Sequence, residues 1–573
     1  MRKLLKYLSH YKKETVLAPL FKLLEAAFEL LVPLVMASII DRGIADGDRP
    51  HVFWMGGILL GLGIIGLTCS LTAQFFAAKA AVRFTAKIKN VLFRHIFSFS
   101  YSQLDRLGSS TLITRMTSDM NQVQSGVNLV LRLFLRSPFI VFGAMIMAFF
   151  VDVKAALVFV VVIPLLAIVV FGIMLLNIPI FKKVQNRLDT LTRNTRENMV
   201  GSRVIRAFGL QKEWTDEFAG NNQSLLKVQL LGGRISALMN PFTYVLINTA
   251  LVVLIYVGAL RVEGGFLSQG QVVALVNYMS QILVELIKLA NLIISTTKAV
   301  ACGNRIQSIL DIEPEKNQGD LNIQSIEKIE FSHVGFCYDN AKEEALTDIN
   351  FTIKKGQTIG IIGGTGSGKS TLVNLICGYY HATRGKISIN DSDIDVIQPQ
   401  SLLDKIGIVP QKAVLFSGTV EDNLRWRHEN ACEEELWEAV ENAQARDFLE
   451  KKEGMLKAKV AQGGKNFSGG QRQRLTIARA LVGHPQLLIL DDSTSALDYN
   501  TDAALRNAIA KLPDHPIVII VSQRTNSISN ADQILVMDDG ELVGVGTHNE
   551  LLKNCAVYQE IFNSQFSRGG EKQ

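Results

Sequence analysis

A glycine-rich string in the second half of the chain has the residue types and spacing that hold a nucleoside triphosphate. It runs from Gly363 to Ser370 as GGTGSGKS and fits the pattern G-x-x-x-x-G-K-[ST]. In this pattern backbone N–H groups cradle the phosphates, the lysine (Lys369) reaches the β and γ phosphates, and the hydroxyl of Ser370 ligates Mg²⁺. The apolar run GQTIGIIG precedes the string and STLVNLICGY follows it, so we expect a loop between a strand and a helix N-terminus. The residues predicted to contact ATP are Gly363, Gly364, Thr365, Gly366, Ser367, Gly368, Lys369, Ser370 and Thr371.

Two further strings follow in order: FSGGQ at Phe467 to Gln471 and LLILDDSTSALD at Leu487 to Asp498. The order of the three strings resembles the ATP-binding cassette (ABC) family, and the resemblance extends over the whole chain. In that family two cassettes pair head to tail, and the signature motif of each closes over ATP held by the P-loop of the other. The resemblance implies that one cassette cannot complete an ATP site alone.

The resemblance also implies roles for single residues outside the P-loop. Tyr338 resembles the aromatic residue that stacks on adenine, and Gln411 resembles the glutamine near Mg²⁺. Asp491 ends the Walker B strand, and the metal ligands implied are Ser370, Gln411 and Asp491. The signature residues, which would contact the ATP of a partner cassette, are Ser468, Gly469, Gly470 and Gln471.

Two catalytic positions depart from the family pattern. Asp492 stands where the family usually has a glutamate that positions the attacking water, and its carboxylate is withdrawn by one C–C bond, about 1.5 Å. A misplacement of about 1 Å can cost on the order of a hundredfold in rate. Gln523 stands where the family usually has a histidine, and an amide donates a hydrogen bond but carries no titrating proton at neutral pH. Either change alone is compatible with an active variant, but together they predict a site that binds ATP and hydrolyses it slowly.

The signature motif is nearly intact, with Phe467 in place of the usual leucine. Its serine hydroxyl and glycine N–H groups can meet a γ-phosphate without obstruction by side chains. A good signature beside a poor hydrolytic site resembles the degenerate subunit of bacterial heterodimeric multidrug ABC exporters. We therefore expect a heterodimer with a second half-transporter that carries the catalytic glutamate and histidine, and faster hydrolysis at the site which this chain's signature completes.

Composition indicates a membrane half joined to a soluble half. The chain has 573 residues, of which 48% are hydrophobic and only 20% charged, and a mean hydropathy of +0.22. Six apolar stretches are long enough to cross a bilayer: 15–40, 53–80, 128–151, 155–179, 236–260 and 272–299. The predicted fold is a polytopic all-α membrane domain of six helices with long cytoplasmic extensions, followed by an α/β P-loop nucleotide-binding domain. The predicted boundaries are 1–304 for the membrane domain, 305–328 for a polar linker and 329–573 for the cassette.

The charges between the spans predict the orientation. The N-terminal segment MRKLLKYLSHYKK and the two long connections after spans two and four are rich in Lys and Arg, so they face the cytoplasm. We therefore expect a multi-pass protein of the cytoplasmic (cell inner) membrane, with its N-terminus and its cassette in the cytoplasm. These loops also explain the net charge of +6 without a nucleic-acid partner. In the exporter family such long connections end in short coupling helices, and the matching positions here are near Ser110–Arg115 and Leu210–Glu213.

Six charged residues fall within or at the edges of the predicted spans, as pairs three or four residues apart: Glu25 and Glu29, Arg132 and Arg136, Glu285 and Lys288. An ionisable group inside a membrane is a candidate for function. The alternative is that these side chains face other helices, pair with each other or lie beyond the membrane core at a helix end, and the sequence leaves both interpretations open.

These patterns favour a subunit of an ATP-driven exporter of hydrophobic or amphipathic compounds, drugs or lipids, that works among membrane lipids. As an enzyme it would be an ATP hydrolase coupled to transport, with hydrolysis mainly at the site completed by the partner. The alternative is a regulatory or nucleotide-gated membrane subunit that binds ATP and transports nothing itself. Asp492 and Gln523 keep this alternative open.

Overall fold

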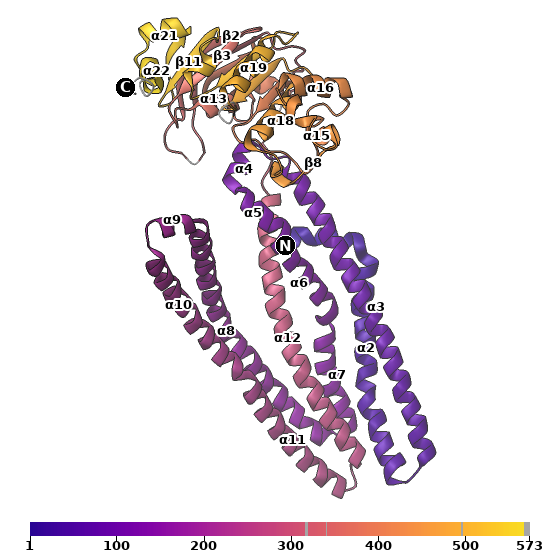
Figure 1. Cartoon of the computed structure of the whole chain (residues 1–573). Coiled ribbons are helices and arrows are strands. Elements are labelled where there is room, and N and C mark those ends of the chain that lie inside the picture. Colours follow the sequence, from indigo (N-terminus) through magenta and orange to yellow (C-terminus); the bar gives the residue numbers. More distant parts are fainter. Residues whose placement is uncertain (316–318, 340, 494–496, 567–573) are drawn as a thin grey trace. The chain divides into compact units, whose positions relative to one another are not determined.

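The computed structural model describes residues 1–315, 319–339, 341–493 and 497–566 (Figure 1). The chain divides into two compact units. The helical unit comprises Met1–Phe97 and Ser110–Glu313, and the sheet unit comprises Ser98–Ser109 and Pro314–Gln573. A short segment between two long helices therefore belongs with the C-terminal half of the chain.

Long apolar helices build the helical unit. Within the described residues, six segments are long and apolar enough to cross a membrane: Lys3–Ala45, Arg49–Ile96, Ser109–Val151, Val153–Val200, Gln211–Glu263 and Gln269–Leu310. Each contains one of the six predicted spans, so the predicted number is confirmed. The 42 residues of Gln269–Leu310 measure about 63 Å at 1.5 Å per residue, against about 30 Å for the hydrocarbon core. The helices therefore extend beyond the bilayer, as predicted.

Polar side chains cap the N-termini of several of these helices. Asp48, Asp152 and Ser268 each accept a hydrogen bond from a backbone N–H in the first turn of the helix that follows, as helix N-caps do. The helices of the helical unit are α1 (Arg2–Leu5), η1 (Lys6–Tyr11), α2 (Lys12–Ser38), η2 (Ile39–Ala45), α3 (Arg49–Ile96), α5 (Ser109–Thr114), η3 (Arg115–Asp119), α6 (Met120–Leu133), α7 (Arg136–Val151), α8 (Val153–Val200), α9 (Ser202–Ala207), α10 (Gln211–Ala237), α11 (Met239–Glu263) and α12 (Gln269–Leu310).

Small residues let the membrane helices approach closely. Ala73, Ala77 and Ala80 on α3 are fully buried, and α3 packs along α2. A Cβ added at Gly126 on α6 would lie 2.2 Å from Cβ of Ala299 on α12, so the methyl group of Ala299 packs directly on the backbone of α6. Small residues at such contacts are typical of membrane helix bundles, where lipid gives no hydrophobic drive for association.

Two short helices occur in the long connections, but earlier than the predicted coupling segments. In the first connection α4 spans Tyr101–Leu107, with Ser100 and Gln103 forming a capping box, and Gly108 ends it with a φ of 73°. In the second connection α9 spans Ser202–Ala207, and Gln211 already begins the long helix α10. The predicted coupling segment near Ser110–Arg115 falls on α5 and η3, and the one near Leu210–Glu213 falls on the start of α10, so both stay predictions.

The sheet unit contains two main sheets. Four strands, in the order β2-β1-β4-β5, form an antiparallel sheet, and six strands, in the order β12-β11-β3-β10-β9-β6, form a sheet that is parallel except for β12. The central strands read as apolar runs such as IVIIV, which suits strands buried on both faces. The strands are β1 (Lys328–Phe336), β2 (Leu346–Lys354), β3 (Thr358–Gly363), β4 (Arg384–Ile389), β5 (Ser392–Asp393), β6 (Ile406–Val409), β7 (Gly418–Thr419), β8 (Lys459–Val460), β9 (Leu487–Asp491), β10 (Ile517–Val521), β11 (Gln533–Asp538) and β12 (Glu541–Gly546).

Helices cover these sheets and complete two apolar cores. One core joins the antiparallel sheet to β3 and to the helix after it, and the other joins the parallel sheet to the helices of the segment around residues 420–482. The helices are α13 (Lys369–Ile376), η4 (Ile394–Val396), α14 (Pro399–Leu403), α15 (Val420–Leu424), α16 (Glu433–Asn442), α17 (Arg446–Leu449), η5 (Met455–Lys457), η6 (Gln462–Gly464), α18 (Gly469–Leu481), α19 (Tyr499–Ala510), α20 (Thr525–Ile528), α21 (His548–Asn554) and α22 (Ala556–Phe566). The predicted fold class, an all-α membrane domain followed by an α/β P-loop domain, is confirmed.

Candidate functional site

Four adjacent parallel strands bring most of the predicted site residues to one edge of the large sheet. The strands β3, β10, β9 and β6 are neighbours in that order, and Val521 of β10 lies opposite both Ile361 and Asp491. The predicted residues follow the carboxyl ends of these strands. The glycine-rich loop follows β3, Gln523 follows β10, Asp491 and Asp492 end or follow β9, and Gln411 follows β6. The carboxyl edge of a parallel sheet is where open α/β folds bind ligands.

The glycine-rich loop needs its glycines. Gly366 and Gly368 have φ values of 88° and 92°, in the left-handed region that other residues avoid. A Cβ at Gly368 would also lie 2.6 Å from Cδ2 of Leu346. At Gly364 and Gly366 nothing lies within 4 Å of the position that a Cβ would take, so this face of the loop is open to a ligand.

Lys369 begins α13 and turns its ammonium group back into the loop. Its Nζ donates to the carbonyl of Gly363 at 2.9 Å, to Oγ of Ser367 at 3.2 Å and to the carbonyl of Gly364. Burial lowers the pKa of Lys369, and the negative charges of Asp491 and Asp492 act against that shift. A half-buried cation at a helix N-terminus is suited to the phosphates of a nucleotide, because they supply the missing counter-charge.

The residues beside the loop fit a magnesium ion. Ser370 Oγ donates to Oδ2 of Asp491 at 3.3 Å, and Gln411 Nε2 donates to Oδ2 of Asp492 at 3.4 Å. Burial raises the pKa of Asp491, with the hydrogen bond from Ser370 opposing and the charge of Asp492 adding to the rise. Hydroxyl, carboxylate and amide oxygens are ligands that Mg²⁺ accepts, together with substrate phosphates. No group of three or more His, Cys, Asp or Glu suited to a metal occurs in the described part of the chain, so an ion here would depend on phosphate oxygens.

The two unusual positions, Asp492 and Gln523, differ in how they are held. Asp492 adopts a φ of 44°, and its backbone N–H donates to the carbonyl of Val521 at 3.0 Å. The side chain of Gln523 is exposed, and the backbone carbonyl of Gln523 accepts a hydrogen bond from Nε2 of Gln565 at 2.7 Å. Both backbones are fixed at the sheet edge. Residues 494–496, inside the string that ends at Asp498, lie outside the described residues.

Tyr338 lies two residues after β1, beside the helix that starts at the loop. Its hydroxyl is 3.0 Å from Oγ1 of Thr371, and its ring makes edge contacts with Phe336 at 4.7 Å and Tyr380 at 5.4 Å between centroids. The structure thus brings Tyr338 to the P-loop helix. Its predicted stacking on adenine remains a prediction.

The signature residues form the N-terminus of α18. Ser468 is the N-cap: its Oγ accepts from the N–H of Gln471 at 3.3 Å, while its own N–H donates to Oε1 of Gln471 at 3.0 Å. A serine hydroxyl still has its own proton to donate when it accepts such a bond. The N–H groups of Gly469 and Gly470 lie in the first turn of a 13-residue helix, where backbone donors lack intrahelical partners. The motif can therefore offer several donors to an anion outside the helix.

The sequence analysis did not predict the contacts that α4 makes with the loops of the sheet unit. Within the sheet unit, Ser102 Oγ donates to Oδ2 of Asp339 at 2.6 Å, and the ring of Tyr101 stacks on Tyr379 at 4.3 Å. The hydroxyl of Tyr380 donates to Oδ2 of Asp105 at 2.5 Å. The adjacent tyrosines Tyr379 and Tyr380, three and four residues after α13 ends, were the available signal, since tyrosine is enriched at contact surfaces.

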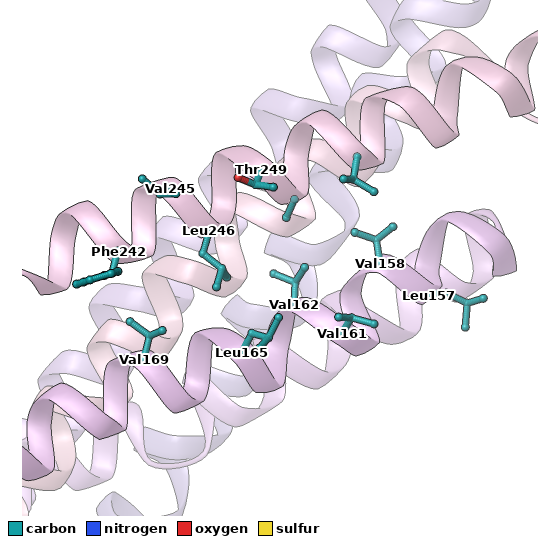
Figure 2. Close-up of a pocket in the computed structure, with 12 residues that line it drawn as sticks. Leu157, Val158, Val161, Val162, Leu165, Val169, Phe242, Val245, Leu246 and Thr249 are labelled. Atoms are coloured by element: carbon teal, nitrogen blue, oxygen red, sulfur yellow. The ribbon is translucent and has the colours of Figure 1, made fainter.

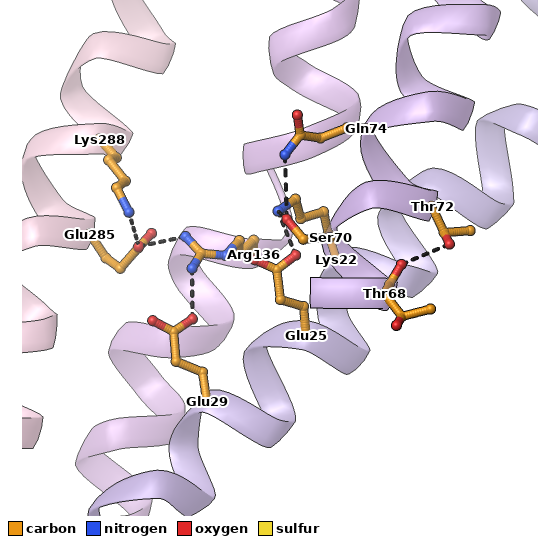
Figure 3. Close-up of polar contacts among 10 residues, drawn as sticks. All are labelled: Lys22, Glu25, Glu29, Thr68, Ser70, Thr72, Gln74, Arg136, Glu285 and Lys288. Carbon is orange, nitrogen blue, oxygen red and sulfur yellow. Dashed lines mark hydrogen bonds and ion pairs between the residues drawn. The ribbon is translucent and has the colours of Figure 1, made fainter. Parts of the chain in front are cut away.

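The charged residues of the membrane spans meet across helices (Figure 3). Arg136 donates to Glu285 at 2.6 Å and to Glu29 at 2.7 Å, and Lys288 donates to Glu285 at 2.8 Å. Of the six predicted residues, Glu25 and Arg132 are not part of these contacts, and Glu25 pairs instead with Lys22 on the same helix. The partners in the three contacts above lie on α2, α7 and α12, and of these contacts only that between Lys288 and Glu285 joins residues of one helix.

An apolar cavity of 660 Å³ lies between α8 and α11 (Figure 2). Figure 2 shows Val158, Val162 and Leu165 of α8 facing Leu246 and Phe242 of α11. Thr249 is the one polar residue among its twelve lining residues, so the cavity is suited to hydrocarbon.

Comparisons with known proteins agree with this geometry. The sequence matches the ABC transporter transmembrane region family over residues 15–286 and the ABC transporter family over residues 346–495. It is 36% identical to the uncharacterized ABC transporter ATP-binding protein YfiB of Bacillus subtilis (strain 168), over 100% of both chains. It is 29% identical to the ATP-dependent lipid A-core flippase of Yersinia pestis, over 99% of this chain and 98% of the flippase.

A solved structure shares the fold. The structure of a bacterial Atm1-family ABC exporter with ATP bound superimposes with a TM-score of 0.80 at 20% identity, over 98% of this chain and 99% of that one. A nucleotide-binding domain of this family binds ATP with Mg²⁺ and couples its hydrolysis to transport. The chain belongs to the ABC transporter family and is an exporter half-transporter, with six membrane helices in the cytoplasmic membrane and a cytoplasmic ATP-binding domain.

Proposed function

We propose that this chain is the degenerate-site subunit of a heterodimeric ABC exporter. One observation carries the proposal: a nearly intact signature at the N-terminus of α18 occurs in the same cassette as a shortened carboxylate, Asp492, at the hydrolytic position. The signature serves the ATP bound to the partner's P-loop. The chain's own P-loop binds ATP that is hydrolysed slowly.

Different residues of the sheet unit act at the slow and the fast ATP site. At the slow site the loop Gly363–Ser370 would bind the phosphates, and Ser370, Asp491 and Gln411 would hold Mg²⁺, which would supply positive charge against the phosphates. Asp492 reaches less far toward the attacking water than a glutamate. At the fast site Ser468 and the N–H groups of Gly469 and Gly470 bind the γ-phosphate of the partner's ATP.

The substrate is proposed to be a hydrophobic or amphipathic compound, a drug or a lipid. The name of the Yersinia relative gives lipid A-core as the molecule that it flips, which supports a lipid-like substrate for this chain. The apolar cavity between α8 and α11 is a place for hydrocarbon within the helical unit. We also propose the boundaries 1–304, 305–328 and 329–573 for membrane domain, linker and cassette, although α12 continues to Leu310.

Asp492 and Gln523 also favour a second candidate, a regulatory or nucleotide-gated subunit that binds ATP without transport of its own. The two candidates differ in what the partner does. An exporter pair hydrolyses ATP and moves a substrate, whereas a regulatory subunit changes the activity of a partner that transports without this chain.

The proposal predicts that the tagged full-length chain copurifies with a second half-transporter that has Glu and His where this chain has Asp492 and Gln523. The pair should hydrolyse ATP at steady state much faster than this chain purified alone, because only the pair contains a complete catalytic site. The measurement is ATPase activity per mole of complex, with the chain alone as control. Equal turnover by this chain alone would show that it forms an active homodimer and would overturn the proposal.

A further inference from the structure

Six charged side chains gather inside the helical unit in two neighbouring groups (Figure 3). Lys22 and Glu25 of α2 form an ion pair at 2.5 Å, and Lys22 Nζ also donates to Oγ of Ser70 on α3 at 3.1 Å. The second group joins Glu29 of α2, Arg136 of α7, and Glu285 and Lys288 of α12. Each group contains as many cations as anions, so both are neutral.

The second group lies at the depth of the membrane core. Arg136 is 15 residues before Val151, where α7 ends, and Glu285 is 16 residues after Gln269, where α12 begins. These ends face outward, because α12 leads at its other end toward the cytoplasmic domain. At 1.5 Å per residue the two side chains start about 22 and 24 Å from the outer helix ends, inside a hydrocarbon core of about 30 Å.

A proline interrupts the hydrogen bonds of the helix beside the group. The third span is divided into α6, which ends at Leu133, and α7, which begins at Arg136. Pro138 has no N–H, so it cannot donate to the carbonyl of Phe134 four residues earlier. Phe134 and Leu135, between the two helices, keep right-handed helical φ and ψ angles. The proline therefore removes a backbone hydrogen bond beside the group without changing the course of the helix.

Two of the four side chains in this group are buried and two are partly exposed. An ion network that only held the helices together would not need the exposed pair. The side chains of Arg136 and Glu285 are 8% and 3% exposed, and Glu285 also accepts from Ser137 Oγ at 2.8 Å. The side chains of Glu29 and Lys288 are 39% and 42% exposed. A charge open to lipid at this depth is costly, so in the assembled transporter Glu29 and Lys288 face water, a polar ligand or the partner half-transporter.

Building on the proposed export function, we propose that Glu29 and Lys288 bind the zwitterionic head of an amphipathic substrate. The carboxylate of Glu29 binds its cationic group, and the ammonium of Lys288 binds its anionic group. The buried pair Arg136–Glu285 holds both side chains in place, since each exposed residue is bonded to one member of it.

Charge balance selects a zwitterion over a simple ion. The group of four carries no net charge, so a ligand with a net charge would leave an unpaired charge in a poorly hydrated space, which costs free energy. A headgroup with one positive and one negative charge leaves no unpaired charge. Lysophosphatidylethanolamine is a suitable probe, because its head carries one ammonium and one phosphate group.

The test compares three detergent-soluble probes with matched chains: lysophosphatidylethanolamine, which is zwitterionic, lysophosphatidylglycerol, which is anionic, and an alkyltrimethylammonium, which is cationic. Binding is measured by equilibrium titration of the purified heteromer without nucleotide. We expect the zwitterion to bind most tightly. Glu29→Gln and Lys288→Gln should each weaken its binding about tenfold, the loss expected for one charge-assisted contact.

The charge preference should move in opposite directions in the two variants. Glu29→Gln leaves the group with one excess positive charge and should favour the anionic probe, whereas Lys288→Gln should favour the cationic probe. Lys288→Arg keeps the charge and should keep the preference for the zwitterion. Lys79→Gln is the matched control, because Lys79 is 34% exposed and pairs with a glutamate, Glu14, at 3.6 Å in the same unit, and it should change nothing.

The inference would be overturned if the variants bound all three probes more weakly by the same factor. It would also be overturned if the order of affinity for the probes were unchanged in both variants. The same preparations are assayed for ATPase activity. If the heteromer hydrolyses ATP but shows no charge preference, the headgroup site is wrong and the proposed function stands. If the probes bind as expected but the heteromer hydrolyses ATP no faster than this chain alone, the proposed function is wrong.

Discussion

Replacing Ser468 by arginine should lower the steady-state ATPase activity of the heteromer about a hundredfold or more, whereas Asp492→Asn should leave a substantial fraction of it. Ser468 caps α18 and, in the proposed pairing, contacts the γ-phosphate of the partner's ATP. Loss of one preorganised contact to such a charge costs on the order of 3 kcal/mol in the barrier, and the arginine also blocks the approach of the phosphate. Asp492 acts only at the slow site, so little of the total activity depends on it.

Thr547→Arg is the matched control for this experiment. Thr547 is also the N-cap of a helix in a capping box, α21, and losing such a cap costs about 1 kcal/mol of stability in either variant. The heteromer with Thr547→Arg should retain nearly all ATPase activity. If Asp492→Asn is as inactive as Ser468→Arg, the assignment of the fast and slow sites is wrong.

Restoring the two missing groups should activate the slow site. In a heteromer whose partner has lost its own catalytic glutamate, Asp492→Glu with Gln523→His should raise ATPase activity about a hundredfold, because the carboxylate regains about 1.5 Å of reach. Both backbones are already fixed at the carboxyl ends of β9 and β10, so the new side chains start from the correct edge of the sheet.

The single variants Asp492→Glu and Gln523→His are the controls for this gain. Each supplies one of the two groups, so each should give less activity than the pair. No gain from the double variant, with ATP binding at this P-loop intact, would mean that the slow site is limited by something other than these two side chains.

Much of the nucleotide site was predictable because local patterns determine it. The glycine-rich loop requires residues that tolerate positive φ, as Gly366 and Gly368 do, and it lies between an apolar strand and a helix. Apolar runs such as those of β9 and β10 indicate strands of a parallel sheet. Residues that follow such strands meet at one edge, which is why Gln411, Asp491 and Gln523 lie together.

Other features depend on contacts between distant segments. Arg136 bonds to Glu285 and Glu29, which are 149 and 107 residues away, and no periodicity along one helix predicts such pairs. The short helix α4 is a different case, because it has local signals. Ser100, Gln103 and Gly108 are a capping box and a C-terminal glycine that stand in the sequence, so the helix could have been placed from them.

The nucleotide state of each P-loop tests the central claim most directly. The heteromer is incubated with Mg²⁺ and radiolabelled photoactivatable ATP for several turnovers, cross-linked by light and separated into its two chains, and the nucleotide on each chain is identified. The account predicts mainly triphosphate on this chain and diphosphate on the partner, because ATP bound by Lys369 and its loop persists through many cycles at the other site. Diphosphate on both chains in equal amounts would contradict it.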